Sequence, residues 1–316
     1  MTQLKSTLAF AAAALVAATM TTSAMAAGQC KTVRFADVGW TDITATTAAT
    51  SAVLKSLGYT PNAKVLSVPV TYKSLENKDI DVFLGNWMPT MEGDIAPYRK
   101  NGSVESLTPA NLEGAKYTLA VNKIAADAGL RDFKDIAKFK DQLDGKIYGI
   151  EPGNDGNRLI QDMFDKNAFG LKGFEVVESS EQGMLSQVAR SNKRKKMVVF
   201  LGWEPHPMNA NFKLTYLTGG DDFFGPNLGG ATVFTNVRKG YIAECPNVGK
   251  LLGNLKFSLA MENEIMGAIL NDAKDPGKAA TAWLQKHPDV VKGWLAGVKT
   301  LDGGDGWAAA KKGLGL

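Results

Sequence analysis

Short apolar runs alternate with stretches of helical periodicity along the first third of the chain. The apolar runs lie at residues 32–37, 63–68 and 81–85, and helical patterns fill the intervals between them, at 43–57 and 72–77. Short runs of this kind are typical of buried strands. Strands that alternate with helices form parallel sheets with right-handed crossovers. The pattern therefore predicts a βαβαβ unit in this part of the chain.

The same order of elements recurs further along the chain. Apolar runs at 146–150, 174–178 and 197–202 enclose helical patterns at 158–167 and 183–191. A second βαβαβ unit is therefore predicted, and the repetition indicates an α/β protein with two lobes of similar topology.

Two extended segments, 117–121 and 231–235, are expected to carry the chain between the lobes. Each follows one of the repeated units, and the chain beyond the second is predicted to be helical, including 246–260 and 278–297. Such a tail is expected to pack back on the first lobe, which would then be discontinuous. The predicted domains are a first lobe of residues 27–116 and 231–316 and a second lobe of residues 117–230.

One short phrase recurs at the end of a predicted strand in each unit. FLGNWMP contains Trp87 and FLGWEP contains Trp203, while Trp40 follows the first predicted strand of the chain. In open parallel α/β sheets, ligands bind at the carboxyl ends of the strands. The three indoles are therefore expected to meet in one cleft between the lobes, although a single tryptophan after a strand is more often part of the core.

The ring chemistry indicates the class of ligand. Tyr117 lies at the first crossing segment, close enough in the chain path to join the three indoles. A quaternary ammonium ion cannot donate hydrogen bonds and is recognised by electron-rich ring faces. Four such rings with few fixed hydrogen-bonding groups favour a cationic ligand of this class over a sugar phosphate or a peptide.

Polar residues lie in the turns at the same predicted edge. Asp42 lies in the first turn, and Asn154 and Asp155 lie in the corresponding turn of the second unit. Each is a candidate ligand contact, but each can also cap the helix that follows it. His206, between two prolines just after the second phrase, is a further candidate, with fixing of its loop as the alternative.

The amino terminus has the pattern of a secretory signal. Residues 1–26 combine a polar start containing Lys5, an apolar stretch at 8–18 and a small-x-small ending at Ala26, after which cleavage is predicted. The apolar stretch is too short for a comfortable bilayer span. The mature protein is therefore expected to be exported and not inserted in a membrane.

Composition limits the classes of partner. The chain has 316 residues and 45% hydrophobic residues, enough for two lobes with cores of their own. Its formal net charge of +4 indicates neither a nucleic-acid partner nor an anionic membrane surface.

The chain has two cysteines, Cys30 and Cys245. In an exported protein an isolated pair is more often a disulfide than a metal site, with two free buried thiols as the alternative. A disulfide would hold the two ends of the mature chain in the same lobe.

Patterns for catalysis are scarce. His206 and His287 are the only histidines, and the sequence contains no G-x-S-x-G elbow and no P-loop. We therefore expect no enzyme, no metal and no cofactor. The alternative from another class is an exported enzyme that acts on choline esters or phosphocholine, which would need a nucleophile and a base beside the rings.

The motifs together resemble a known family. GWTDIT at 39–44, the two FLG phrases, EPGNDGN at 151–157 and the AxxWL and HPDVV segments of the tail are similar to those of the periplasmic substrate-binding proteins of bacterial ABC importers for glycine betaine and choline. The resemblance covers the mature chain and implies a bilobed periplasmic binding protein fold of type II, a monomer, and an ABC permease as partner. It also implies ligand-binding roles, with an aromatic box of Trp40, Trp87, Tyr117 and Trp203 and polar contacts from Asp42 and Asn154.

The choline-binding members of this family are the most similar. Asp42 beside the box would attract a bare cation and repel the carboxylate of a betaine. Against this, the helix start after Asn154 offers backbone amides that suit a carboxylate. Choline is therefore the predicted ligand, and glycine betaine or proline betaine is the alternative.

Overall fold

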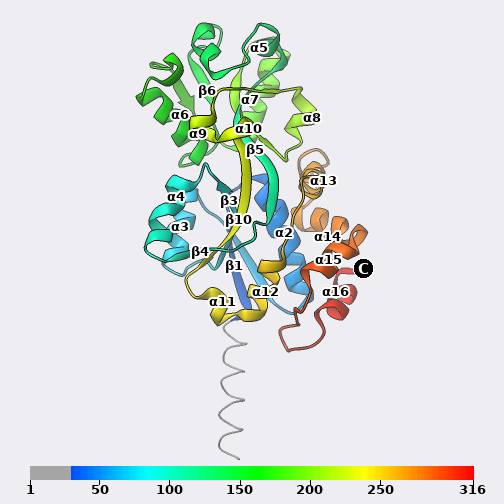
Figure 1. Ribbon diagram of the computed structural model, residues 1–316. Helices are drawn as coiled ribbons and strands as arrows, with labels where there is room; N and C mark the ends of the chain where they lie inside the picture. Colours follow the sequence, from blue (N-terminus) through cyan, green and yellow to red (C-terminus); the bar gives the residue numbers. More distant parts are fainter. Residues whose placement is uncertain (1–29) are drawn as a thin grey trace, which may run out of the picture.

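The computed structural model describes residues 30–316, so the predicted signal segment, residues 1–26, lies outside the described residues. Figure 1 shows two lobes that are joined by two long strands, β5 (Leu112–Val121) and β10 (Gly230–Arg238). The predicted bilobed α/β fold is therefore confirmed. Among residues 30–316, no helix combines the length and the apolar character that a membrane crossing requires.

Lobe 1 contains β1 to β4, α2 to α4 and the helices from α11 onward. Its first unit has the predicted order, with β1 parallel to both β2 and β3. The bounds are β1 (Thr32–Asp37), α2 (Thr41–Ser56), β2 (Thr60–Val65), α3 (Val68–Glu76), β3 (Val82–Met88), α4 (Glu92–Lys100) and β4 (Val104–Ser106).

Lobe 2 contains the elements between β5 and β10. Its β6 is parallel to β7 and to β8, as the repeated unit predicts. The bounds are α5 (Lys123–Asp127), η1 (Phe133–Phe139), β6 (Lys146–Tyr148), α6 (Asp155–Asp165), η2 (Ala168–Gly170), β7 (Glu175–Val177), α7 (Glu181–Lys193), β8 (Val199–Glu204), α8 (Met208–Phe212), β9 (Thr215–Tyr216), α9 (Asp221–Phe224) and α10 (Pro226–Gly229).

The two parallel groups belong to one continuous sheet. The strand order is β2-β1-β3-β10-β5-β8-β6-β7, and the pairs β3–β10, β10–β5 and β5–β8 are antiparallel. The junction of the lobes is thus made of paired strands whose backbone groups bond to each other. The predicted domain boundaries fall within or at the start of β5 and β10, and remain a prediction.

The carboxyl-terminal region is helical but more divided than predicted. Its helices are α11 (Tyr241–Glu244), α12 (Pro246–Asn254), α13 (Leu259–Leu270), α14 (Pro276–Lys286), α15 (Pro288–Trp294) and α16 (Gly306–Leu314). The expected helix 246–260 breaks before Ser258, whose hydroxyl caps α13 by accepting the Met261 N–H. The expected helix 278–297 breaks at His287 because Pro288 begins α15 and has no N–H to continue α14.

A disulfide joins Cys30 to Cys245, as predicted. It ties Cys30, two residues before β1, to Cys245, the residue before α12, and both cysteines lie in lobe 1. Helices α13, α14 and α16 pack against α2 in the same lobe. Helix α2, which begins directly after Trp40, is therefore supported by the carboxyl-terminal region.

Candidate functional site

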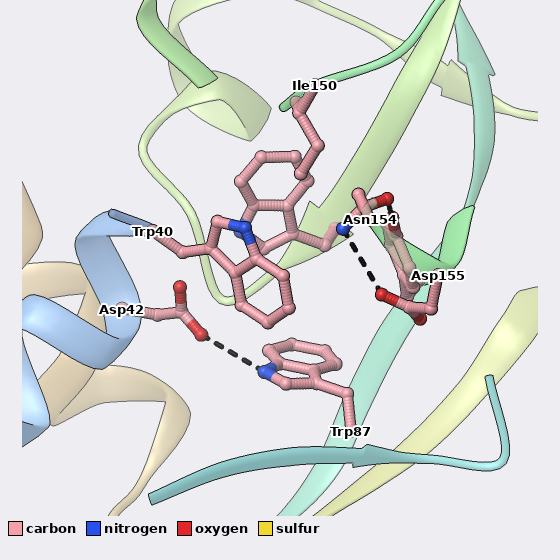
Figure 2. Close-up of a pocket in the computed structure, with 8 residues that line it drawn as sticks. Trp40, Asp42, Trp87, Ile150, Asn154 and Asp155 are labelled. Carbon is pink, nitrogen blue, oxygen red and sulfur yellow. Dashed lines mark hydrogen bonds between the residues drawn. The ribbon is translucent and has the colours of Figure 1, made fainter. Parts of the chain in front are cut away.

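A small cavity lies between the two lobes. Figure 2 shows the side chains converging on one space from both lobes. The lining residues are Trp40, Asp42, Trp87, Tyr117, Ile150, Asn154, Asp155 and Trp203. The structure thus brings together the seven residues that sequence reasoning proposed as ligand contacts, and adds Ile150.

The sheet register explains how the aromatic side chains meet. Tyr117 of β5 pairs directly with Trp203 of β8, and Trp87 of β3 pairs with Val233 of β10. Trp87 and Trp203 lie within their strands, and not after them as predicted. The antiparallel pairing of β3 with β10 and of β8 with β5 continues past the Phe-Leu-Gly residues and includes both tryptophans. Trp40 reaches the same space from the start of α2.

The rings form a group with edge-to-face contacts. The Tyr117 ring centroid lies 6.1 Å from that of Trp87 and 6.2 Å from that of Trp203, with interplanar angles of 65° and 82°. The Trp40 Nε1–H donates to Glu151 Oε1 at 2.8 Å, and the Trp87 Nε1–H donates to Asp42 Oδ2 at 3.1 Å. Because these polar edges are already bonded, the ring faces remain for a ligand.

Asp42 places a carboxyl group beside the rings. Its Oδ2 accepts the Trp87 indole N–H, whereas its buried Oδ1 has no hydrogen-bond partner among residues 30–316. Burial, followed by repulsion from Glu181, raises the pKa of Asp42 to about 8. Asp42 is not the cap of α2, since Trp40 occupies that position. The capping alternative for Asp42 is therefore wrong, and one of its oxygens remains available to a ligand.

Asn154 is the N-cap of α6. Capping was the alternative to a ligand contact for this residue. Its Oδ1 accepts the backbone N–H groups of Gly156 and Asn157 at 2.8 and 3.2 Å, and also the Tyr117 hydroxyl at 2.9 Å. Its amide donates to Asp155 Oδ1 at 3.1 Å. With its oxygen so occupied, Asn154 can offer a ligand only its remaining amide hydrogen.

Asp155 is a second buried carboxyl group at the cavity. Its Oδ2 has no partner among the described residues, and burial is the main cause that raises its pKa to about 6. It lies in the first turn of α6, where the helix dipole favours negative charge. Two carboxyl groups, one from each lobe, therefore face the same aromatic space.

His206 does not line the cavity. Its ring packs behind Trp203, with centroids 4.9 Å apart, and its Nδ1 accepts the Met208 backbone N–H at 2.9 Å. Its Nε2 lies 3.2 Å from Glu181 Oε1. These contacts support the loop-fixing role and give no support to direct ligand contact.

Two residues of the site region were not anticipated. Ile150 supplies an apolar wall, and the available signal was its place as the last apolar residue before the EPGNDGN turn. Glu151 fixes the Trp40 indole, and burial raises the pKa of Glu151 to about 7. No sequence pattern links Glu151 to Trp40, because the two residues belong to different lobes.

The arrangement suits recognition of a cation. Ring faces and carboxylate oxygens both attract positive charge, more strongly in a buried site than in bulk water. No group of three or more histidine, cysteine, aspartate or glutamate side chains within residues 30–316 is placed to hold a metal ion.

Residues 31–286 match the family described as the substrate binding domain of ABC-type glycine betaine transport systems, OpuAC. The chain belongs to this family. The resemblance inferred from the GWTDIT, FLG and EPGNDGN motifs is thereby confirmed. Membership assigns the chain to substrate-binding transport proteins and not to a family of enzymes.

Solved structures of the family include close relatives. The chain is 71% identical to an ABC-transporter choline binding protein in complex with choline, with a TM-score of 0.90 over 91% of this chain and 99% of that one. An unliganded, semi-closed choline binding protein gives 72% identity and a TM-score of 0.84 over 91% and 100%. Lactococcal OpuAC, closed on glycine betaine, gives 25% identity and a TM-score of 0.76 over 84% and 100%.

Proposed function

We propose that this protein captures choline between its lobes and delivers it to the permease of an ABC importer. The observation that carries the proposal is the aromatic cavity between the lobes, in which one carboxyl oxygen of Asp42 has no hydrogen-bond partner within residues 30–316. The 71% identical protein whose structure contains choline supports the same ligand.

The rings provide the main attraction for the trimethylammonium group. A desolvated cation–π contact contributes about 2 kcal/mol, so four rings contribute roughly 8 kcal/mol before the cost of association. With the charge of Asp42 added, affinity near the micromolar range follows, around −8 kcal/mol.

The polar groups favour choline over a betaine. Asp42 and Asp155 each present an oxygen without a hydrogen-bond partner in the described part of the chain, and when ionised both would repel the carboxylate of a betaine. The Gly156 and Asn157 amides at the start of α6, which would suit a carboxylate, are already bonded to the Asn154 side chain. A choline hydroxyl can instead donate to Asp42. Glycine betaine or proline betaine remains the second candidate, since the family includes a protein that binds glycine betaine.

The site gives less support to the enzymatic alternative. Hydrolysis of a choline ester or phosphocholine would require a nucleophile and a base beside the rings. The eight lining residues include no serine, cysteine or histidine. We therefore propose a binding protein that acts as a monomer in the periplasm, after export by the predicted signal.

Titration calorimetry with choline on the protein without residues 1–26 tests this proposal. We expect one choline to bind per chain with a dissociation constant near or below the micromolar range. An absence of saturable heat, together with an unchanged melting temperature in millimolar choline, would contradict the proposal.

A further inference from the structure

Helix α2 begins without a cap from its own lobe. Trp40 is its N-cap residue, but an indole offers no acceptor and makes no capping bond. The first N–H of the helix, that of Thr41, instead donates to Glu181 Oε2 at 2.8 Å, and the Thr41 hydroxyl donates to Glu181 Oε1. Glu181 belongs to α7 of lobe 2. The start of α2 is thus satisfied by a side chain from across the cleft.

Glu181 is well held for this contact. It lies in the first turn of α7, after the N-cap Ser180, and its side chain is fully buried. His206 Nδ1 accepts a backbone N–H, so the ring hydrogen is on Nε2 and is donated to Glu181 Oε1. Three donors, two of them from Thr41, therefore converge on one buried carboxyl group. A negative charge at the start of α2 is also favoured by its helix dipole.

This group of contacts connects opposite walls of the cavity. Thr41 lies between Trp40 and Asp42 in the chain, and the His206 ring packs against the back of Trp203. Any change in the position of the first residues of α2 would move both Trp40 and Asp42, which line the cavity. We infer that Glu181 is a positioning residue, which caps α2 across the cleft when the lobes close and thereby fixes Trp40 and Asp42 around the ligand. This inference rests on the proposed function.

Other contacts across the cleft are less suited to this role. Arg158 of α6 bonds to Asp94 of α4 at 2.8 Å, but the Arg158 side chain is 38% exposed, and exposed ion pairs contribute little. Glu151 holds only the edge of the Trp40 ring. The Glu181 contact is buried and acts on the backbone from which both Trp40 and Asp42 project. Without the carboxyl group, the closed form would leave the Thr41 and His206 donors buried and unpaired.

The test compares Glu181→Ala and Glu181→Gln with Glu175→Ala, a change at an exposed position of the neighbouring strand β7. Affinity and dissociation rate are measured with choline and with glycine betaine at pH 9, where Asp42 is ionised with or without the nearby Glu181 charge. The melting temperature is measured without ligand. We expect Glu181→Ala to bind choline about tenfold more weakly, mainly through faster dissociation, with an unliganded melting temperature close to that of Glu175→Ala. Glu181→Gln keeps one acceptor and should fall between wild type and Glu181→Ala.

Two results would overturn the positioning role. One is a Glu181→Ala protein that binds and releases ligand as Glu175→Ala does. The other is an equal loss of affinity and of unliganded stability, which would indicate a purely structural role. If the wild type bound betaine and not choline, the proposed function would fail. The betaine affinity of Glu181→Ala relative to that of Glu175→Ala would still decide the role of Glu181. A wild type that bound neither ligand would overturn both.

Discussion

Replacement of Trp203 by leucine should weaken choline binding by about 2 kcal/mol, or about 30-fold. Leucine keeps an apolar side chain against Tyr117 and His206 but removes the ring face that the cation would contact. Phenylalanine keeps a ring, although a weaker one than indole, so Trp203→Phe should lose less affinity than Trp203→Leu. Calorimetric titration of both variants with choline measures the order and the size of the two losses.

The control for this prediction is Trp294→Leu. Trp294 is fully buried in lobe 1, where its Nε1–H bonds to the Lys256 carbonyl, and it does not line the cavity. This variant should lose stability as a large-to-small core change does, yet keep the wild-type affinity for choline. Equal affinities of Trp203→Leu and Trp294→Leu would mean that the Trp203 ring does not contact the ligand.

The second large effect is expected for Asp42→Asn, and it should depend on pH. The pKa of Asp42 is about 8 in the empty site because the group is buried. A bound cation stabilises the carboxylate and lowers this pKa, so binding below pH 8 releases a proton and becomes tighter as the pH rises. Choline itself does not titrate. Wild-type affinity should therefore rise about tenfold between pH 7 and pH 9, and change little above that range.

Asparagine keeps the shape and an acceptor for the Trp87 indole but carries no charge. The variant should bind choline at least tenfold more weakly than the wild type at pH 9, and the difference should shrink towards pH 7. Because Asp42 is buried, the loss should persist at high salt. Asp79→Asn, at an exposed position of lobe 1, provides the control. Identical pH profiles for the wild type and Asp42→Asn would remove Asp42 from the proposed site.

The sequence was informative where one local feature determines the position of a side chain. The repeated FLG phrase marks strands on either side of the lobe junction, and parallel α/β units bring such strand ends to one edge. The residues proposed from this reasoning, from Trp40 to Trp203, line one cavity. The two breaks in the carboxyl-terminal helices were missed because helical periodicity continues across the cap at Ser258 and the turn before Pro288.

The remaining features depend on contacts between lobes. Within lobe 1, Trp40 and not Asp42 occupies the N-cap position of α2, and the Asp42 carboxyl group accepts the indole N–H of Trp87 from strand β3. Glu151 and Glu181 appear in the sequence as ordinary acidic residues of lobe 2, and only the fold places them on Trp40 and Thr41. Such pairings have no local signature, since they depend on how two separately folded units meet.

The central claim is that the cavity selects choline by its positive charge and its lack of a carboxylate. Calorimetry with choline and with glycine betaine on the same preparation, at pH 9 where Asp42 is ionised, tests it most directly. Both ligands carry a trimethylammonium group, so the difference in affinity reports on the other end of the ligand. The account predicts that choline binds at least tenfold more tightly, as repulsion by the Asp42 and Asp155 carboxyl groups requires. Tighter binding of glycine betaine would contradict it.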